Sequence, residues 1–292
     1  MRNIHYKFLI LIWVYFSGLG QNLLYAQDYA SKIALVIGNT EYTNLPRLKN
    51  ASNDAFAVAQ ALSNKGFTVF LVRDVNAQEL RDSLTFVSSR AAHAEQIFIY
   101  YAGHNEIQNG TPQLIPINSA ASPGENPPLA LTIPDLLEYF DIPFAQKTVV
   151  IDACLQDPPA PYDTGLQTLS LPKALGLETL LVFATSFGQA AYDGTGDHSV
   201  FTGAFLDYMV KDTLNLQNTI QSVRNDVIQS SRTNQIPVSV STLTRPYILD
   251  ARGSVIRDFK SQNDLIQSYS SSGYASKPLL DTISLGINPT GF

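Results

Sequence analysis

Two short apolar runs that each end on a reactive side chain constrain the fold of this chain more than any other feature. One covers residues 97–104 and ends in His104, and the other covers residues 148–154 and ends in Cys154. Both are nearly continuous in apolar character and rich in β-branched and aromatic residues, which is typical of strands buried on both faces of a parallel sheet. Ligands bind and chemistry takes place at the carboxyl edge of such sheets. The sequence therefore predicts a histidine and the only cysteine of the chain at that edge.

Strand and helix patterns alternate along the rest of the chain, which predicts an α/β fold, a three-layer sandwich with a mostly parallel central sheet. Asn53 or Asp54 is the expected cap of the first helix, and the later pairs Asn76 with Glu79 and Thr132 with Asp135 have capping-box spacing. Residues 106–131 are expected to form a long polar loop, and 155–176 a segment rich in proline and glycine. Expected strands cover 33–37, 67–72, 97–104, 148–154 and 180–184, with a last strand or short pair within 237–249, and expected helices cover 55–62, 80–91, 136–140, 201–208 and 216–227.

Residues 1–26 have the pattern of a secretory signal peptide, with basic Arg2 and Lys7, an apolar run at 8–16 and the small residue Ala26 at the expected cleavage site. The apolar run is shorter than the roughly 20 residues of a spanning helix, although an uncleaved membrane anchor is the alternative. We therefore expect an exported protein, periplasmic or extracellular, with no membrane attachment after cleavage. Its main domain would cover residues 27–250, and a Ser-rich tail of unknown structure would cover 251–292.

The charge and the cysteine count exclude several kinds of function. Loss of the signal peptide takes the formal net charge from −6 to about −8, and the chain has no basic stripe, so nucleic acid is not an expected partner. A single Cys permits no internal disulfide, and it is too far along the chain from the four His residues for a structural zinc site. Asp193 and Asp197 could attract calcium, but two carboxylates are few for an ion that takes about six to eight oxygens, so a turn is the expectation there. The sequence does not indicate an oligomeric state.

His104 and Cys154 together have the chemistry of a base and a nucleophile. The reactive form of cysteine is the thiolate, which a neighbouring imidazole helps to form and then complements as a proton donor. Consecutive strands are usually neighbours in space, so the two residues can meet. The alternative is that Cys154 is a small core residue and His104 a loop histidine.

The residues around both positions resemble the caspase-like cysteine peptidases, the group of caspases, metacaspases and their bacterial relatives. Residues 100–104 are similar to that family's strand and catalytic histidine, and residues 151–154 to its nucleophile strand. His104 and Cys154 are 50 residues apart, the separation found in caspases. The resemblance covers about residues 32–250 and extends to the stretches 35–39 with Tyr42, 48–55, 183–185, 193–194 and 199–202.

The resemblance implies a caspase-like fold and hydrolysis of peptide bonds in a peptide or protein substrate. Cys154 would attack the carbonyl, His104 would transfer the protons, and the backbone N–H groups of Cys154 and Asn105 would stabilise the oxyanion. Metacaspase-type relatives bind Arg or Lys at the P1 position through acidic residues that match Asp152 and Asp54, so we expect cleavage after Arg or Lys and not after Asp. The alternatives are a helix cap for Asp54 and a structural hydrogen bond for Asp152.

Three departures from the family pattern favour a rival hypothesis, a catalytically impaired caspase-fold protein that works as a protein-binding module. The family usually has glycine at Asn105, bacterial relatives usually have Arg at Leu155, and residues 157–161 form a proline-rich run. Asn tolerates left-handed backbone angles, so the oxyanion donor could survive at position 105. We expect self-processing at Lys173. His93, at the end of an expected helix, is expected to be a solvated or capping group, and the resemblance assigns no role to His198.

Overall fold

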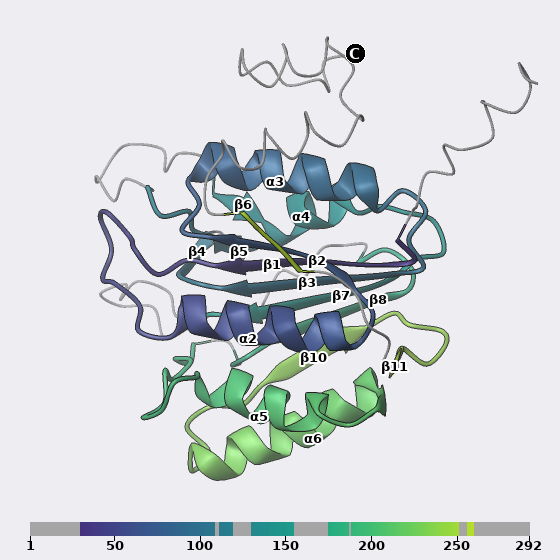
Figure 1. Ribbon diagram of the computed structural model, residues 1–292. Coiled ribbons are helices and arrows are strands. Elements are labelled where there is room, and N and C mark those ends of the chain that lie inside the picture. The colour runs from purple at the N-terminus through teal and green to yellow at the C-terminus, as the bar shows by residue number, and fades with distance from the viewer. Residues whose placement is uncertain are drawn as a thin grey trace, which may run out of the picture.

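The computed structural model describes residues 30–108, 111–118, 130–154, 175–186, 188–250 and 256–259. A seven-stranded sheet lies between two layers of helices (Figure 1), so the predicted three-layer α/β sandwich is confirmed. Neighbouring strands are parallel throughout, except that the edge strand β10 (Val238–Ser241) is antiparallel to β8 (Thr179–Phe183). In spatial order the strands are β10 (Val238–Ser241), β8 (Thr179–Phe183), β7 (Gln146–Asp152), β3 (Gln96–Ala102), β1 (Lys32–Gly38), β2 (Thr68–Arg73) and β12 (Ile256–Phe259).

Each face of the sheet has its own hydrophobic core. Helices α3 (Ala77–Arg90) and α4 (Ile133–Tyr139) pack on one face, and α2 (Ala51–Asn64), α5 (Val200–Met209) and α6 (Leu216–Ser230) on the other. Successive residues of a strand point to opposite faces, so Leu35 of β1 joins the α3 core while Val36 joins the α2 core. The continuous apolar character of the strands follows from this burial on both sides.

Two of the three predicted helix starts are confirmed. Asn76 and Thr132 cap α3 and α4, each with a complete capping box. The prediction for the first helix was wrong, because α2 begins at Ala51 with Asn50 at the N-cap position. The hydroxyl of Thr40 accepts the backbone N–H of Ser52 over 3.0 Å, so a side chain outside the helix satisfies its first turn. The carboxylate of Asp54 is therefore available for contacts elsewhere in the fold.

The segment expected to be a long polar loop contains a small sheet of three strands. These are β4 (Asn105–Gln108), β5 (Thr111–Leu114) and β6 (Leu131–Thr132), which pair antiparallel in that order. The prediction of a loop was wrong because the strands are very short and β5 contains a proline, so no alternating pattern identifies them. Ile107 and Leu114 are buried in the core beneath α3 and α4. The small sheet thus begins directly after His104.

The C-terminal part of the described chain adds further pairing. The predicted short strands near the end are present as β10 and β11 (Ile248–Asp250), and β11 pairs with β9 (Thr213–Asn215). Strand β12 lies beyond residue 250, where the periodicity fades, and it pairs in parallel with β2. None of the helices in the described ranges is long and apolar enough to cross a membrane. The expected signal peptide, Leu155, the proline-rich run and Lys173 lie outside the described residues.

Candidate active site

His104 and Cys154 lie at the same edge of the sheet because of the register between β3 and β7. Ala102 is paired with Asp152, and each strand continues for two residues to reach His104 and Cys154. His104 and Cys154 therefore follow adjacent strands, and each lies two residues after the Ala102–Asp152 pair. This edge is the carboxyl end of the parallel strands, where α/β proteins bind ligands.

A backbone carbonyl orients the imidazole of His104. Its Nε2 atom lies 2.8 Å from the carbonyl oxygen of Pro46. A carbonyl oxygen can only accept a hydrogen bond, so Nε2 carries the proton and Nδ1 has the free lone pair in the neutral ring. Pro46 lies in the loop before α2, and no sequence pattern identifies it because the contact uses only its backbone. The arrangement leaves a single nitrogen of the ring able to accept a proton.

Two tyrosines hold the backbone of His104. The hydroxyl of Tyr42 accepts the His104 N–H over 2.8 Å, and the hydroxyl of Tyr101 donates to the His104 carbonyl over 2.6 Å. The Tyr42 and His104 rings also pack edge to face, with centroids 4.5 Å apart. Burial raises the pKa of Tyr42 to about 12, so this hydroxyl stays protonated. A Cβ on Gly103 would lie 2.5 Å from the Tyr101 hydroxyl oxygen and 2.6 Å from that of Tyr42, so only glycine fits between them.

The thiol of Cys154 is half-buried and has a backbone partner. Its Sγ atom lies 3.6 Å from the carbonyl oxygen of Ala191, to which the thiol donates. Burial raises the pKa of the Cys154 thiol, while the negative charges of Asp152 and Asp193 raise it further and the Ala191 contact lowers it. The resting thiol is therefore neutral, and a base must remove its proton before it can act as a nucleophile.

The backbone conformation of Asn105 differs from the left-handed conformation considered in the sequence analysis. It opens β4, where it is paired with Leu114, so its backbone is extended and has no need of the left-handed conformation. Both polar atoms of its side-chain amide are buried, and neither has a hydrogen-bond partner among the described residues. Such a group costs about 1–3 kcal/mol relative to the same group in water. The amide is thus a buried polar group beside His104.

Asp152 is buried at the end of β7 and is surrounded by hydroxyl groups. Its Oδ2 atom accepts hydrogen bonds from the hydroxyls of Ser199 at 2.5 Å and Thr202 at 2.6 Å, and a longer one from Tyr100 at 3.4 Å. Burial raises the pKa of Asp152, and the three hydroxyls act in the opposite direction. The alternative of a structural hydrogen bond for Asp152 is therefore present in the structure, through Oδ2. These hydrogen bonds from described residues all reach Oδ2 and not the other oxygen, Oδ1.

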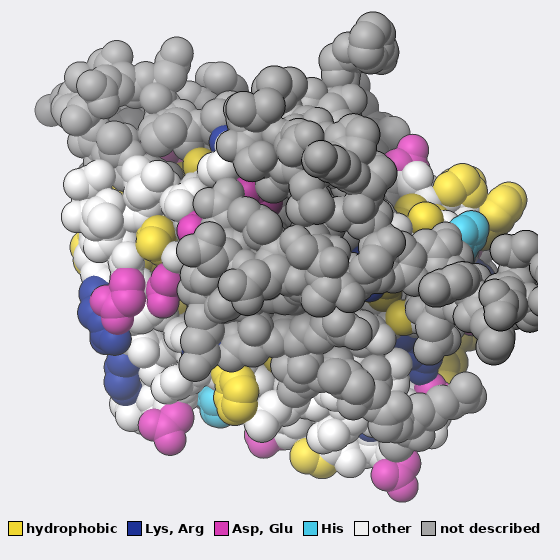
Figure 2. Space-filling model, turned by 45° about the horizontal axis from the view of Figure 1, so that its top comes forward, with side chains coloured by type: hydrophobic (Ala, Val, Ile, Leu, Met, Phe, Trp, Pro, Cys, Tyr) yellow, Lys and Arg dark blue, Asp and Glu magenta, His cyan; other side chains and the backbone are white. Residues whose placement is uncertain are grey.

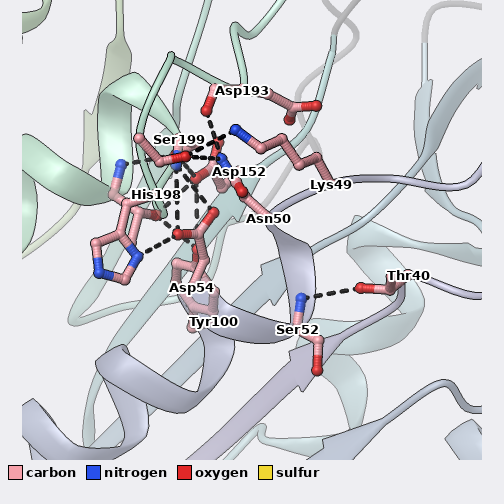
Figure 3. Close-up of polar contacts among 12 residues, drawn as sticks. Thr40, Lys49, Asn50, Ser52, Asp54, Tyr100, Asp152, Asp193, His198 and Ser199 are labelled. Carbon is pink, nitrogen blue, oxygen red and sulfur yellow. Dashed lines mark hydrogen bonds and ion pairs between the residues drawn. The ribbon is translucent and has the colours of Figure 1, made fainter.

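Asp54 lies in the first turn of α2, and its carboxylate faces the start of α5 (Figure 3). Its Oδ1 atom is 2.8 Å from Nδ1 of His198, and the backbone N–H of Ser199 lies 3.3 and 3.2 Å from its two oxygens. Burial raises the pKa of Asp54 to about 8, with a further contribution from the charge of Asp152. Sequence reasoning missed His198, although its place directly before the family-like stretch 199–202 was a usable signal.

The Asp193 to Asp197 segment forms a bend whose carbonyl oxygens accept hydrogen bonds from the end of the loop before α2. Asn50 donates its side-chain N–H to the carbonyl of Asp193 over 2.6 Å, and Lys49 donates to that of Gly196 over 2.9 Å (Figure 3). No cluster of three or more His, Cys, Asp or Glu side chains suited to a metal ion occurs among the described residues. Figure 2 shows Lys or Arg side chains next to Asp or Glu side chains on the left flank of the view, and further charged side chains elsewhere on the same face.

The fold and this edge of the sheet define an α/β protein with a histidine and a cysteine on adjacent strands. The sequence at residues 31–248 matches the Caspase domain family, so the chain belongs to the caspase family. A search of curated proteins found no match. Among solved structures, caspase-1 from Spodoptera frugiperda is similar with a TM-score of 0.60 and 16% identity, over 78% of this chain and 92% of that one. At this identity the structural likeness supports the fold, and the resemblance to caspase-like proteins is confirmed.

Proposed function

We propose that this protein is a cysteine endopeptidase with His104 and Cys154 as its catalytic dyad. The observation that carries the proposal is the hydrogen bond from His104 Nε2 to Pro46, which leaves Nδ1 as the acceptor, together with the position of both residues two places beyond a paired position of β3 and β7. Membership of the caspase family, whose members are typically cysteine peptidases that act on protein substrates, supports the same reaction.

The reaction follows from the groups at the edge of the sheet. His104 takes the thiol proton, and the Cys154 thiolate attacks the scissile carbonyl to form a tetrahedral intermediate. The backbone N–H groups of Cys154 and Asn105 stabilise its oxyanion. His104 then gives the proton to the leaving amine, and in the second half it activates water to hydrolyse the thioester. The thiol of the resting enzyme is neutral, so proton transfer to His104 accompanies attack.

We propose a preference for Arg or Lys at P1. Asp54 and Asp152 are both buried carboxylates, Asp152 lies two residues before Cys154, and Ser199 contacts both carboxylates. The hydrogen bonds that Asp152 accepts from described residues all reach its Oδ2 atom. A guanidinium or ammonium group would supply the charge-assisted hydrogen bond that a buried carboxylate requires. The proposal is supported by this charge arrangement and by the match of both positions to metacaspase-type relatives.

The test is hydrolysis of fluorogenic peptides that differ only at P1, with residues 27–292 under reducing conditions, with and without calcium. We expect turnover after Arg and Lys, none after Asp, and none by a Cys154→Ala variant. Faster cleavage after Asp would refute the P1 preference but not the dyad. Calcium dependence would point to a cation site that the described residues do not form. Mass spectrometry of the active enzyme tests cleavage at Lys173, which an intact chain would refute.

A second candidate function, binding of proteins without catalysis, has one observation in its favour. The Cys154 thiol is half-buried, is hydrogen-bonded to Ala191 and has a raised pKa, as expected of a structural cysteine. Alkylation distinguishes the two functions, because a dyad cysteine reacts with iodoacetamide near neutral pH and a structural one does not. A folded protein with no turnover and an unreactive Cys154 would favour the binding module.

We also propose that the protein is exported and that a signal peptide is removed after Ala26. The proposal is supported by the basic start, the short apolar run and the small residue at the cleavage site. N-terminal sequencing of the protein recovered outside the cytoplasm is expected to begin at Gln27. Recovery of the chain only in the membrane fraction with an intact start would instead show an uncleaved anchor.

A further inference from the structure

Ser199 joins the two buried carboxylates of the proposed P1 pocket. Its backbone N–H contacts Asp54 and its hydroxyl donates to Asp152. The Thr202 and Tyr100 hydroxyls also donate to Asp152. All of these donors are neutral, so they satisfy oxygen atoms but leave the charge of two buried carboxylates without compensation, which is costly in a protein interior.

Among the described residues, His198 is the only group able to carry positive charge that contacts either carboxylate. Its Nδ1 atom is 2.8 Å from Oδ1 of Asp54. The other titratable groups facing this cluster are Tyr100 from β3 and Asp193 from the loop before α5, and neither can carry a positive charge. Lys49 lies beside the same loop, but its ammonium group donates to the backbone of Gly196.

We propose that His198 determines the specificity of this pocket by sharing one proton with Asp54, and that an arginine or lysine side chain of the substrate replaces that proton. The exchange balances charge, because one cation enters the pocket as one proton leaves to solvent. The only covalent bond broken is the one that holds this proton, either N–H on His198 or O–H on Asp54. His198 acts on the substrate through Asp54 and is therefore a positioning residue. The inference rests on the proposed basic P1 pocket.

Exposure and charge support this exchange. The Asp54 side chain is 2% exposed, whereas that of His198 is 34% exposed, so the ring links the buried carboxylate to solvent and gives the proton a way out. The raised pKa of Asp54, caused by burial and by Asp152, means that this carboxyl group retains a proton at neutral pH. A substrate cation opposes protonation of its neighbours and so expels that proton. The 2.8 Å contact between His198 Nδ1 and Asp54 Oδ1 lets this proton pass between the two side chains.

Thermodynamic linkage makes this effect reciprocal. The factor by which a bound cation weakens proton binding equals the factor by which the bound proton weakens cation binding. If one proton is released, the affinity of the pocket for a cation falls by up to about tenfold for each pH unit below the pKa of Asp54, which is about 8. A pocket of permanently ionised carboxylates would show no such dependence. The pocket thus favours basic substrates at neutral and alkaline pH.

Calorimetry with benzamidine, whose amidinium resembles a guanidinium, tests the proposal without any turnover. Binding to the Cys154→Ala chain is measured at pH 6.5 in buffers of different ionisation enthalpy, which gives the number of protons released. We expect close to one proton per benzamidine, and little release when Asp54→Asn is added, since Asn can still accept the Ser199 N–H. Equal release by both proteins, or none by the first, would overturn the proposal.

A second measurement follows the histidine itself. In NMR spectra at pH 6.5, benzamidine is expected to move the Cε1–H signal of His198, because the proton that this ring shares with Asp54 leaves. The signal of the exposed His93 provides an internal control that does not move. An unmoved His198 signal at saturation would overturn the proposal. Absence of benzamidine binding between pH 6 and 8.5 would overturn both this exchange and the basic P1 pocket. Hydrolysis of other peptides by intact Cys154 protein would in that case still support the peptidase.

Discussion

The hydroxyl of Tyr42 accepts a hydrogen bond from the backbone N–H of His104 over 2.8 Å, although the two residues are 62 positions apart. The same hydroxyl donates to the carbonyl of Ile115 over 3.1 Å, which ties the loop after β1 to the end of β5. The tyrosine therefore fixes the histidine backbone, while Pro46 fixes its ring. Proton transfer depends on such positioning, since a shift of about 1 Å can cost about 100-fold in rate.

Tyr42→Phe is expected to lower kcat/KM for the preferred peptide by about 10–100-fold, because the ring remains but His104 loses a backbone partner. Leaving the backbone N–H of His104 unpaired is also expected to reduce the free energy of unfolding by about 1–3 kcal/mol, whereas the Ile115 carbonyl still accepts from Tyr101 and Asn39. Tyr208→Phe is the matched control, since it removes a hydroxyl that bonds Asp226 on the surface. Similar losses in both variants would contradict the role of Tyr42.

Gly103→Ala is expected to displace His104, because the new Cβ would lie within 2.6 Å of the hydroxyls of Tyr101 and Tyr42. Both hydroxyls are held by backbone groups, so they cannot move away without losing hydrogen bonds. We expect a loss of activity of at least about tenfold and a destabilisation of about 1–3 kcal/mol, typical of overpacking. At Gly196, where a Cβ would meet no described atom within 4 Å, the same change should be neutral in both assays.

Asn105→Leu is expected to raise the free energy of unfolding by about 1–2 kcal/mol, because it removes two buried polar atoms that have no partner among the described residues. Asn105 is paired with the buried Leu114, and directly paired residues of antiparallel strands share a face, so a leucine side chain suits the position. Urea denaturation measures the change. A less stable variant would show that the amide has a stabilising partner outside the described residues.

Asp54→Asn is expected to change how stability depends on pH. The pKa of Asp54 is raised in the folded protein from its ordinary value of 3.8 to about 8, so the folded state binds this proton more tightly than the unfolded chain does. The resulting contribution to stability is complete below about pH 4 and is lost as the pH rises through about 8, with a limiting slope of about 1.4 kcal/mol per pH unit. Unfolding curves at several pH values should be flatter between pH 4 and 8 for the variant. Parallel curves for both proteins would refute the assignment.

Local patterns in the sequence predicted most of the architecture. The central strands are apolar on both faces, and the helices have apolar residues at spacings of three and four. Burial therefore produces a pattern of apolar residues that identifies each element in the sequence. The small sheet after His104 and strand β12 were not predicted, because strands of two to four residues are too short to show a period. The start of α2 was predicted three or four residues late, since its N-cap residue, Asn50, makes no side-chain capping bond.

The sequence by itself determined that a histidine and a cysteine lie at the ends of two buried strands, because a strand buried on both faces appears as a continuous run of apolar residues. Only the tertiary structure placed Pro46 against the ring of His104 and His198 against Asp54. The first contact uses a backbone oxygen, which every residue has, and the second joins a loop to a helix 144 residues earlier. Such contacts follow from packing between distant segments, which leaves no local period in the chain.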